Sequence, residues 1–172
     1  MSQPSSVDEL SSPSDFISRM RHTTAHVLAQ AIRERMPDAQ MAIGPVIDNG
    51  FFYDFQLPEQ LSEDDFPAIE ARMRQIVKAD LPMVRWSEPR EEARKRCEEL
   101  SQTFKVRLID DLPDEAEISF YQQGDFVDLC KGPHVESTGK IGAFKLMSIA
   151  GAYWRGKAEN EQLTRVYGVA FE

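Results

Sequence analysis

The three histidines of this 172-residue chain, with one of its two cysteines, fall into two pairs of equal spacing. His22 and His26 lie four residues apart, and so do Cys130 and His134. Residues four apart share one face of a helix. The glycine and proline inside the second pair prevent a regular helix, so a turn after a strand must present it. Because zinc favours tetrahedral sets of imidazole and thiolate ligands, the pattern indicates a His3Cys site with Zn²⁺ as candidate cofactor, provided that the pairs meet.

Each half of the pattern also has a simpler interpretation. Two histidines on a helix can form a solvated or hydrogen-bonded pair, and a free cysteine at a strand end is often a small buried hydrophobic residue. The joint occurrence of the two pairs, with no further histidine in the chain, favours a shared site. The second cysteine, Cys97, stands between Arg96 and Glu98 and is interpreted as incidental.

Further polar residues could serve the same site. Asp128 lies two positions before Cys130 and shares its strand face, and Lys105 opens a predicted strand. An acid and an amine near the histidines could position water or stabilise an oxyanion, whereas the alternative for Lys105 is a surface strand end. The run Tyr153-Trp154-Arg155-Gly156 suits either core packing with a surface arginine or stacking against a ribose or base.

The composition is that of a soluble globular domain, with 41% hydrophobic and 28% charged residues. Two cysteines form no disulfide framework, no apolar run reaches membrane-span length and the N-terminus lacks a signal-peptide pattern, so we expect a cytoplasmic protein without a membrane partner. A net charge of -9 disfavours strong RNA binding by this domain alone. An RNA-borne substrate would need a local basic rim, for which the candidates are Arg19, Arg21, Lys131, Lys145, Arg155 and Lys157.

Periodicity and turn signals predict the elements that must position these residues. Residues 1–12 read as a disordered leader, and Ser12 caps a helix that ends near Met36, with the histidine stripe facing away from the main core. Asp48-Asn49-Gly50 is a hairpin signal. Further helices are predicted at residues 62–80 and, capped by Ser87, at 88–100. Strands are predicted at residues 40–46, 51–56, 82–86, 105–109, 117–121, 126–130, 143–149 and 164–171. The pattern indicates an α+β fold over residues 13–172, an antiparallel sheet with the long histidine-bearing helix and further helices packed on it.

Four stretches carry a resemblance to a known family. They are residues 22–26 (HTTAH), 43–54 (IGPVIDNGFFYD), 128–134 (DLCKGPH) and 150–156 (AGAYWRG). In this order, over about residues 19–171, they resemble the editing domain of bacterial-type threonyl-tRNA synthetases. The related alanyl-type editing domains share the His-x-x-x-His and Cys-x-x-x-His pairs, but they are not expected to carry the Gly44-Pro45 and Tyr153-Trp154-Arg155-Gly156 stretches in this form.

The resemblance implies hydrolysis of the ester that joins mistakenly attached serine to threonine tRNA. It implies that His22, His26, Cys130 and His134 lie in the site, with Lys105 and Asp128 as matched polar residues. Tyr53 is implied as a pocket residue, and Arg155 is the second candidate for substrate binding. The expected partners are mischarged Ser-tRNA(Thr) and a synthetase aminoacylation domain, in cis if the chain is a fragment or in trans if it is free-standing, because neither a ubiquitin-like domain nor an aminoacylation domain is present in the sequence.

The roles of these residues are hypotheses. His22 or His26 is the candidate base, Lys105 the candidate water positioner or oxyanion partner, and Asp128 the candidate anchor for the seryl ammonium group. Alanyl-type relatives use the four-ligand set for zinc, but a general base needs an unligated histidine, so the metal question stays open. Two other functions also stay open, an alanyl-type deacylase of seryl- or glycyl-tRNA(Ala) and a non-catalytic module that binds tRNA or a synthetase.

Overall fold

The computed structural model describes residues 13–172, with side chains from Phe16 onward. The predicted leader over residues 1–12 and the Ser12 cap lie outside the described residues. The described chain has an α+β fold of four α-helices and antiparallel sheets, which confirms the predicted class. Within residues 13–172, no helix combines the length and the apolar character that a membrane-spanning segment requires.

The elements occur in the following order. The α-helices are α1 (Pro13–Arg35), α2 (Phe66–Lys78), α3 (Arg90–Glu99) and α4 (Thr103–Asp111), and short 3-10 turns occur at η2 (Glu63–Asp65), η3 (Thr138–Lys140) and η4 (Trp154–Gly156). The strands are β1 (Gln40–Met41), β2 (Val46–Ile47), β3 (Gly50–Gln56), β4 (Val84–Ser87), β5 (Ser119–Gln123), β6 (Phe126–Leu129), β7 (Ala143–Tyr153) and β8 (Gln162–Phe171).

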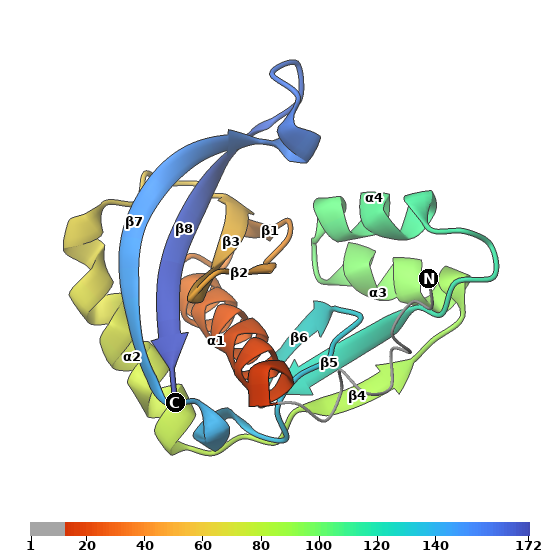
Figure 1. Cartoon of the computed structure of the whole chain (residues 1–172). Helices are drawn as coiled ribbons and strands as arrows, with labels where there is room; N and C mark the ends of the chain where they lie inside the picture. The colour runs from red at the N-terminus through yellow and green to blue at the C-terminus, as the bar shows by residue number, and fades with distance from the viewer. Residues whose placement is uncertain (1–12) are drawn as a thin grey trace, which may run out of the picture.

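The larger sheet is antiparallel throughout and has the order β1-β3-β8-β7, with β2 also paired to β3. Strands β7 and β8 form its long, curved part (Figure 1). Helix α1 contacts β3 and β8, and α2 packs against α1. Val27, Leu28 and Ile32 of α1 are fully buried in one cluster with Phe51 and Phe55 of β3, so burial of apolar surface between helix and sheet forms the main core.

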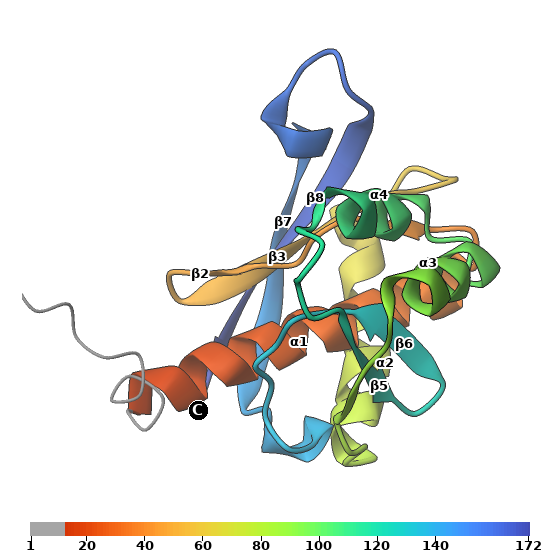
Figure 2. The same cartoon turned by 90° about the vertical axis from the view of Figure 1, so that its right-hand side faces the viewer.

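The smaller sheet has the order β4-β5-β6 and lies on the other side of α1 from β7 (Figures 1 and 2). Helices α3 and α4 pack against each other, and a second core cluster joins them to β5 through Ala93, Cys97, Ile109 and Phe120. The prediction of one sheet was therefore wrong. Because α1 lies between the two groups of strands, β4, β5 and β6 pair only among themselves. One face of α1 packs on the larger sheet, and the other faces the smaller one.

Several local predictions are confirmed. Helices α1 and α2 occur within the predicted ranges, and Ser62 and Asp65 form a capping box at the start of the second range. The Asp48-Asn49-Gly50 signal is indeed a hairpin: Val46 pairs with Phe51, and Asn49 has a φ of 63°. Asparagine tolerates this left-handed conformation better than most residues.

The predicted strand at residues 105–109 is helix α4 instead. The alternation of polar and apolar residues after Phe104 has a period of two, but the buried positions are Phe104, Lys105 and Ile109, which lie on one side of a helix. Lys105 is therefore not a surface strand end. Its side chain projects from a buried helical face.

Two other predicted elements are shorter than expected. In the segment at residues 40–46 only Gln40–Met41 and Val46 lie in regular strands, although between them the Ala42 N–H donates to the Asp54 carbonyl and the Asp54 N–H donates to the Ile43 carbonyl. Gly44 passes close to the Tyr53 ring, where a Cβ would lie 2.3 Å from Cδ2. The helix at residues 88–100 begins at Arg90, after Pro89. Ser87 does not cap it; this residue ends β4 and donates its hydroxyl to Glu117.

Candidate functional site

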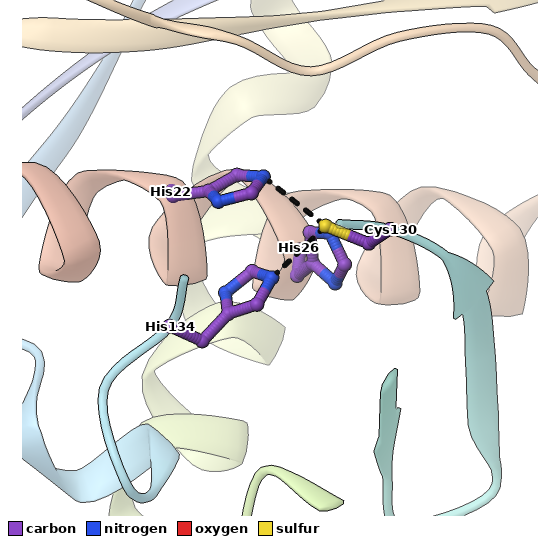
Figure 3. A group of neighbouring side chains, drawn as sticks. All are labelled: His22, His26, Cys130 and His134. Atoms are coloured by element: carbon purple, nitrogen blue, oxygen red, sulfur yellow. Dashed lines mark hydrogen bonds between the residues drawn. The ribbon is translucent and has the colours of Figure 1, made fainter. Parts of the chain in front are cut away.

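The two histidine and cysteine-histidine pairs meet beside the middle of α1. His22 and His26 project from α1, Cys130 follows β6 directly and His134 lies on the segment after it (Figure 3). One ligand atom from each of the four lies within 4.8 Å of the others. The stripe faces the smaller sheet, and His26 is only 2% exposed, which excludes the solvated alternative for that residue.

A tight turn brings His134 back toward Cys130. Gly132 has a φ of 84°, a conformation that side chains other than glycine rarely adopt. A Cβ at this position would lie 2.4 Å from the Tyr121 hydroxyl oxygen. The Tyr121 ring packs edge-on against the His134 ring, with centroids 4.3 Å apart, so a side chain of β5 supports the turn.

The cluster geometry fits a zinc ligand set. His22 Nδ1 lies 3.0 Å from the Pro133 carbonyl oxygen, which has no hydrogen, so Nδ1 donates and Nε2 of the neutral ring keeps its lone pair. Cys130 Sγ lies 3.4 Å from His22 Nε2 and 3.3 Å from His134 Nε2. Tetrahedral zinc would separate such sulfur and nitrogen ligands by about 3.5 Å. His26 Nδ1 is buried without a hydrogen-bond partner, which also suits a cation.

Burial sets the protonation of the cluster. It is the main cause that lowers the pKa of each of His22, His26 and His134, so the three imidazoles are neutral at pH 7. Burial, aided by the carboxylate of Asp128, raises the pKa of the Cys130 thiol to about 12. The metal-free cluster is therefore uncharged, and its free imidazole lone pairs are suited to accepting a proton or binding a cation.

A buried ion pair lies against the cluster. Lys105 Nζ from α4 is 3.1 Å from Asp128 Oδ1 on β6, and both side chains are almost fully buried. The Tyr53 hydroxyl on β3 donates to Asp128 Oδ2 at 2.6 Å, and His26 Nε2 lies 3.5 Å from the same oxygen. Side chains from three elements, α4, β3 and α1, thus converge on one carboxylate of β6. Tyr53 is 1% exposed and supports Asp128 from within the core.

Three surface cavities are lined by residues of the cluster, and two of them by its histidines. One of about 200 Å³ is lined by His22, and another of about 620 Å³ is lined by His134. Arg19 and Pro133 line both cavities, and Lys140 lines the larger one. A small polar substrate can therefore reach His22 and His134 from the surface, past at least two cationic side chains.

The structure does not bring Arg155 into contact with the cluster. This residue forms an ion pair with Asp111 at the end of α4, and its guanidinium lies 5.3 Å from the centroid of the Trp154 ring. Trp154 is buried against Phe104, which agrees with the core-packing interpretation of the Tyr153-Trp154-Arg155-Gly156 run. Of the other rim candidates, Arg21 donates to the Ala170 carbonyl, and Lys131 lines the third cavity together with Cys130.

Two groups in the site were missed by sequence reasoning. The Pro133 carbonyl orients His22, and the Thr23 hydroxyl contacts His134 Nδ1 at 3.0 Å. A threonine inside a helix and a backbone carbonyl in a turn have no distinctive spacing, so the sequence offers no signal for either.

Comparison with known proteins places this geometry in context. The family described as threonyl and alanyl tRNA synthetase second additional domain matches residues 118–167. The chain is 57% identical over 151 residues to a threonine–tRNA ligase of Acetivibrio thermocellus. This match covers 88% of this chain and 24% of that protein. It is also 52% identical over 157 residues to the threonine–tRNA ligase of Marinobacter nauticus, and this match covers 91% of this chain and 24% of that protein. The chain thus spans about a quarter of the length of the relatives that it matches.

Proposed function

This chain belongs to the threonyl and alanyl tRNA synthetase second additional domain family, and from that premise we propose that it hydrolyses the ester of serine mistakenly attached to threonine tRNA. The observation that carries the proposal is the position of His22, whose unprotonated Nε2 lies in the cluster while its ring lines a surface cavity. Residues 13–172 would act as one editing domain in the cytoplasm, with an aminoacylation domain in cis or in trans.

The chemistry of the two amino acids explains the need for such a site. Serine is threonine without one methyl group, and a binding pocket can penalise a missing methyl by only about 1–3 kcal/mol. A second site can select in the opposite sense, because it admits serine and excludes threonine by the bulk of the same methyl. A hydrolase of this kind needs a base for the attacking water, a partner for the oxyanion and an anchor for the amino group.

His22 is the base in this proposal. Its pKa is lowered by burial, so the ring is neutral at pH 7, and the Pro133 carbonyl holds Nδ1–H and leaves Nε2 free to take a proton from water. His26 is a poorer candidate, because it is buried and its Nε2 faces the Asp128 carboxylate. His134 and Cys130 complete the wall of the site.

Asp128 and Lys105 provide opposite charges beside the base. The Asp128 carboxylate has more acceptor positions than its contacts with Tyr53, Lys105 and His26 occupy, so in this proposal it also accepts the seryl ammonium group. The Lys105 ammonium, which has three hydrogens, can donate to the attacking water or to the oxyanion of the tetrahedral intermediate. Tyr53 holds the carboxylate in place through its hydroxyl.

The proposal is tested by incubating the purified chain with three substrates, Ser-tRNA(Thr), Thr-tRNA(Thr) and Ser-tRNA(Ala), under single-turnover conditions. We expect loss of the seryl ester from threonine tRNA and persistence of the threonyl ester. Faster loss from alanine tRNA would instead identify an alanyl-type deacylase. Intact ester in all three, with measurable tRNA binding, would identify a non-catalytic module.

The four-residue ligand set leads to a prediction about zinc. His22, His26, Cys130 and His134 would hold the ion, which would supply a Lewis acid at the site. Because ligation would occupy the lone pair of His22 that the proposal assigns to the base, saturation with Zn²⁺ is expected to slow deacylation by the metal-free protein. Binding itself is followed with Co²⁺, whose thiolate charge-transfer absorption should appear in the wild type and be lost in Cys130→Ser. An increase in rate with zinc would show that His22 is not the base.

A further inference from the structure

Thr23 lies between the two histidines of α1 and makes contacts that neither of them makes. Its side chain is fully buried. The hydroxyl oxygen lies 2.9 Å from the Arg19 carbonyl oxygen, 3.0 Å from His134 Nδ1 and 3.1 Å from the Val135 backbone nitrogen. One threonine oxygen therefore joins helix α1 to the segment that presents His134.

The hydrogens at this junction can be counted. The hydroxyl has one hydrogen, and the Arg19 carbonyl, which has none, can only accept it. The backbone N–H of Val135 can only donate to the hydroxyl oxygen. With the threonine hydrogen directed to Arg19, the third contact requires a donor as well, so His134 Nδ1 must be the protonated nitrogen of its ring.

We propose that Thr23 is a positioning residue of the site, whose hydroxyl holds His134 as the tautomer protonated on Nδ1. The inference rests on the proposed function, since it concerns how an unprotonated ring nitrogen is maintained in the same site. The lone pair of His134 Nε2 then faces Cys130 Sγ, 3.3 Å away, as that of His22 Nε2 does at 3.4 Å. Two unprotonated nitrogens thereby converge on one sulfur.

The chain contains a matched control in the next residue. Thr24 is equally buried and its hydroxyl donates to the Met20 carbonyl at 2.7 Å, which is the same bond to the carbonyl four residues earlier that Thr23 makes. The Thr24 hydroxyl bonds to Met20 and not to His134. Replacement of either threonine by valine removes one such helical bond and retains the side-chain shape, but only Thr23→Val also removes the partner of the His134 ring.

The first experiment measures the tautomer directly. Long-range ¹H–¹⁵N correlation spectra of the protein labelled at its three histidines, recorded without metal, distinguish a ring protonated on Nδ1 from one protonated on Nε2. We expect His134 to be protonated on Nδ1 in the wild type, in Thr23→Ser and in Thr24→Val, and to become a mixture in Thr23→Val. A wild-type ring protonated on Nε2, or a ring unchanged in Thr23→Val, would overturn the proposal. The wild-type spectrum decides the tautomer even if the valine variant does not fold.

The second experiment measures kinetics on seryl-tRNA. Loss of a residue that orients a ligand or catalytic side chain typically costs about 10–100-fold in activity, and we expect a fall of this size in kcat for Thr23→Val with little change in KM, because Thr23 is out of reach of the substrate. Thr23→Ser should retain the wild-type rate, as should Thr24→Val. Equal losses in the two valine variants would reduce Thr23 to a structural role. An inactive wild type with the expected spectra would refute the proposed function and leave the tautomer assignment standing.

Discussion

Replacement of His22 by asparagine is expected to lower the single-turnover rate of seryl ester hydrolysis by about 10²–10⁴-fold, the usual contribution of a general base. The asparagine amide can still donate to the Pro133 carbonyl, as His22 Nδ1–H does, but it has no group at the position of Nε2. The variant therefore removes the proton acceptor and keeps the contact with the turn. The single-turnover rate constant is measured by the release of serine from pre-charged tRNA with the protein in excess.

The corresponding change at His26 gives a comparison within the same helix. His26 is buried and faces Asp128, so its replacement by asparagine is expected to reduce stability as well as rate. Equal thermal stability of His22→Asn and the wild type would show that the loss of rate at His22 is chemical. A His22→Asn protein that hydrolyses the ester at the wild-type rate would remove His22 from the mechanism.

Replacement of Lys105 by methionine is expected to lower the free energy of unfolding by about 3–5 kcal/mol, because it leaves a buried carboxylate without its cation. Lys105 and Asp128 are both almost completely buried, and their charged atoms lie 3.1 Å apart. Methionine has a similar length and no charge, so packing changes little while the ion pair is lost. Urea denaturation followed by circular dichroism measures the effect.

A second substitution separates charge from packing at this position. Lys105→Met combined with Asp128→Asn contains no unpaired buried charge, and Tyr53 can still donate to the amide oxygen. The double variant is expected to recover most of the lost stability and to remain inactive. Arg35→Met, which breaks a partly exposed ion pair with Asp65, serves as the control and should cost much less. A double variant no more stable than Lys105→Met would contradict the assignment of the cost to an unpaired charge.

The sequence predicted the elements whose patterns are local. The long helix with His22 and His26, and the hairpin at Asn49, were found because apolar periodicity and turn chemistry act within a few residues. The pairing of His22 with Cys130 was also anticipated, because matching ligand types at equal spacing left few other partners. The second sheet was not anticipated, since nothing in a strand's own residues identifies which strand it will pair with.

Lys105 shows where local patterns fail. The segment after Phe104 alternates between polar and apolar residues as a strand would, yet packing of Phe104 and Ile109 on two different clusters makes it a helix. The prediction of its chemistry rested on the charge of the amine and not on the element that carries it. Tertiary packing decided the element, and the same packing buried Lys105 in an ion pair with Asp128, whereas the sequence had left a surface strand end as an alternative for Lys105.

The central claim, that one cluster of imidazoles from α1 and the segment after β6 surrounds the reacting ester, is tested most directly by ligand binding. A non-hydrolysable seryl-adenosine, in which an amide replaces the ester, is titrated into protein labelled with ¹⁵N at its three histidines. Saturable shifts of the ring resonances of His22 and His134 are expected, and Lys105→Met combined with Asp128→Asn should weaken binding by removing the anchor for the ammonium group. Saturable binding that leaves all three imidazole resonances unmoved would place the substrate elsewhere and contradict the proposed site.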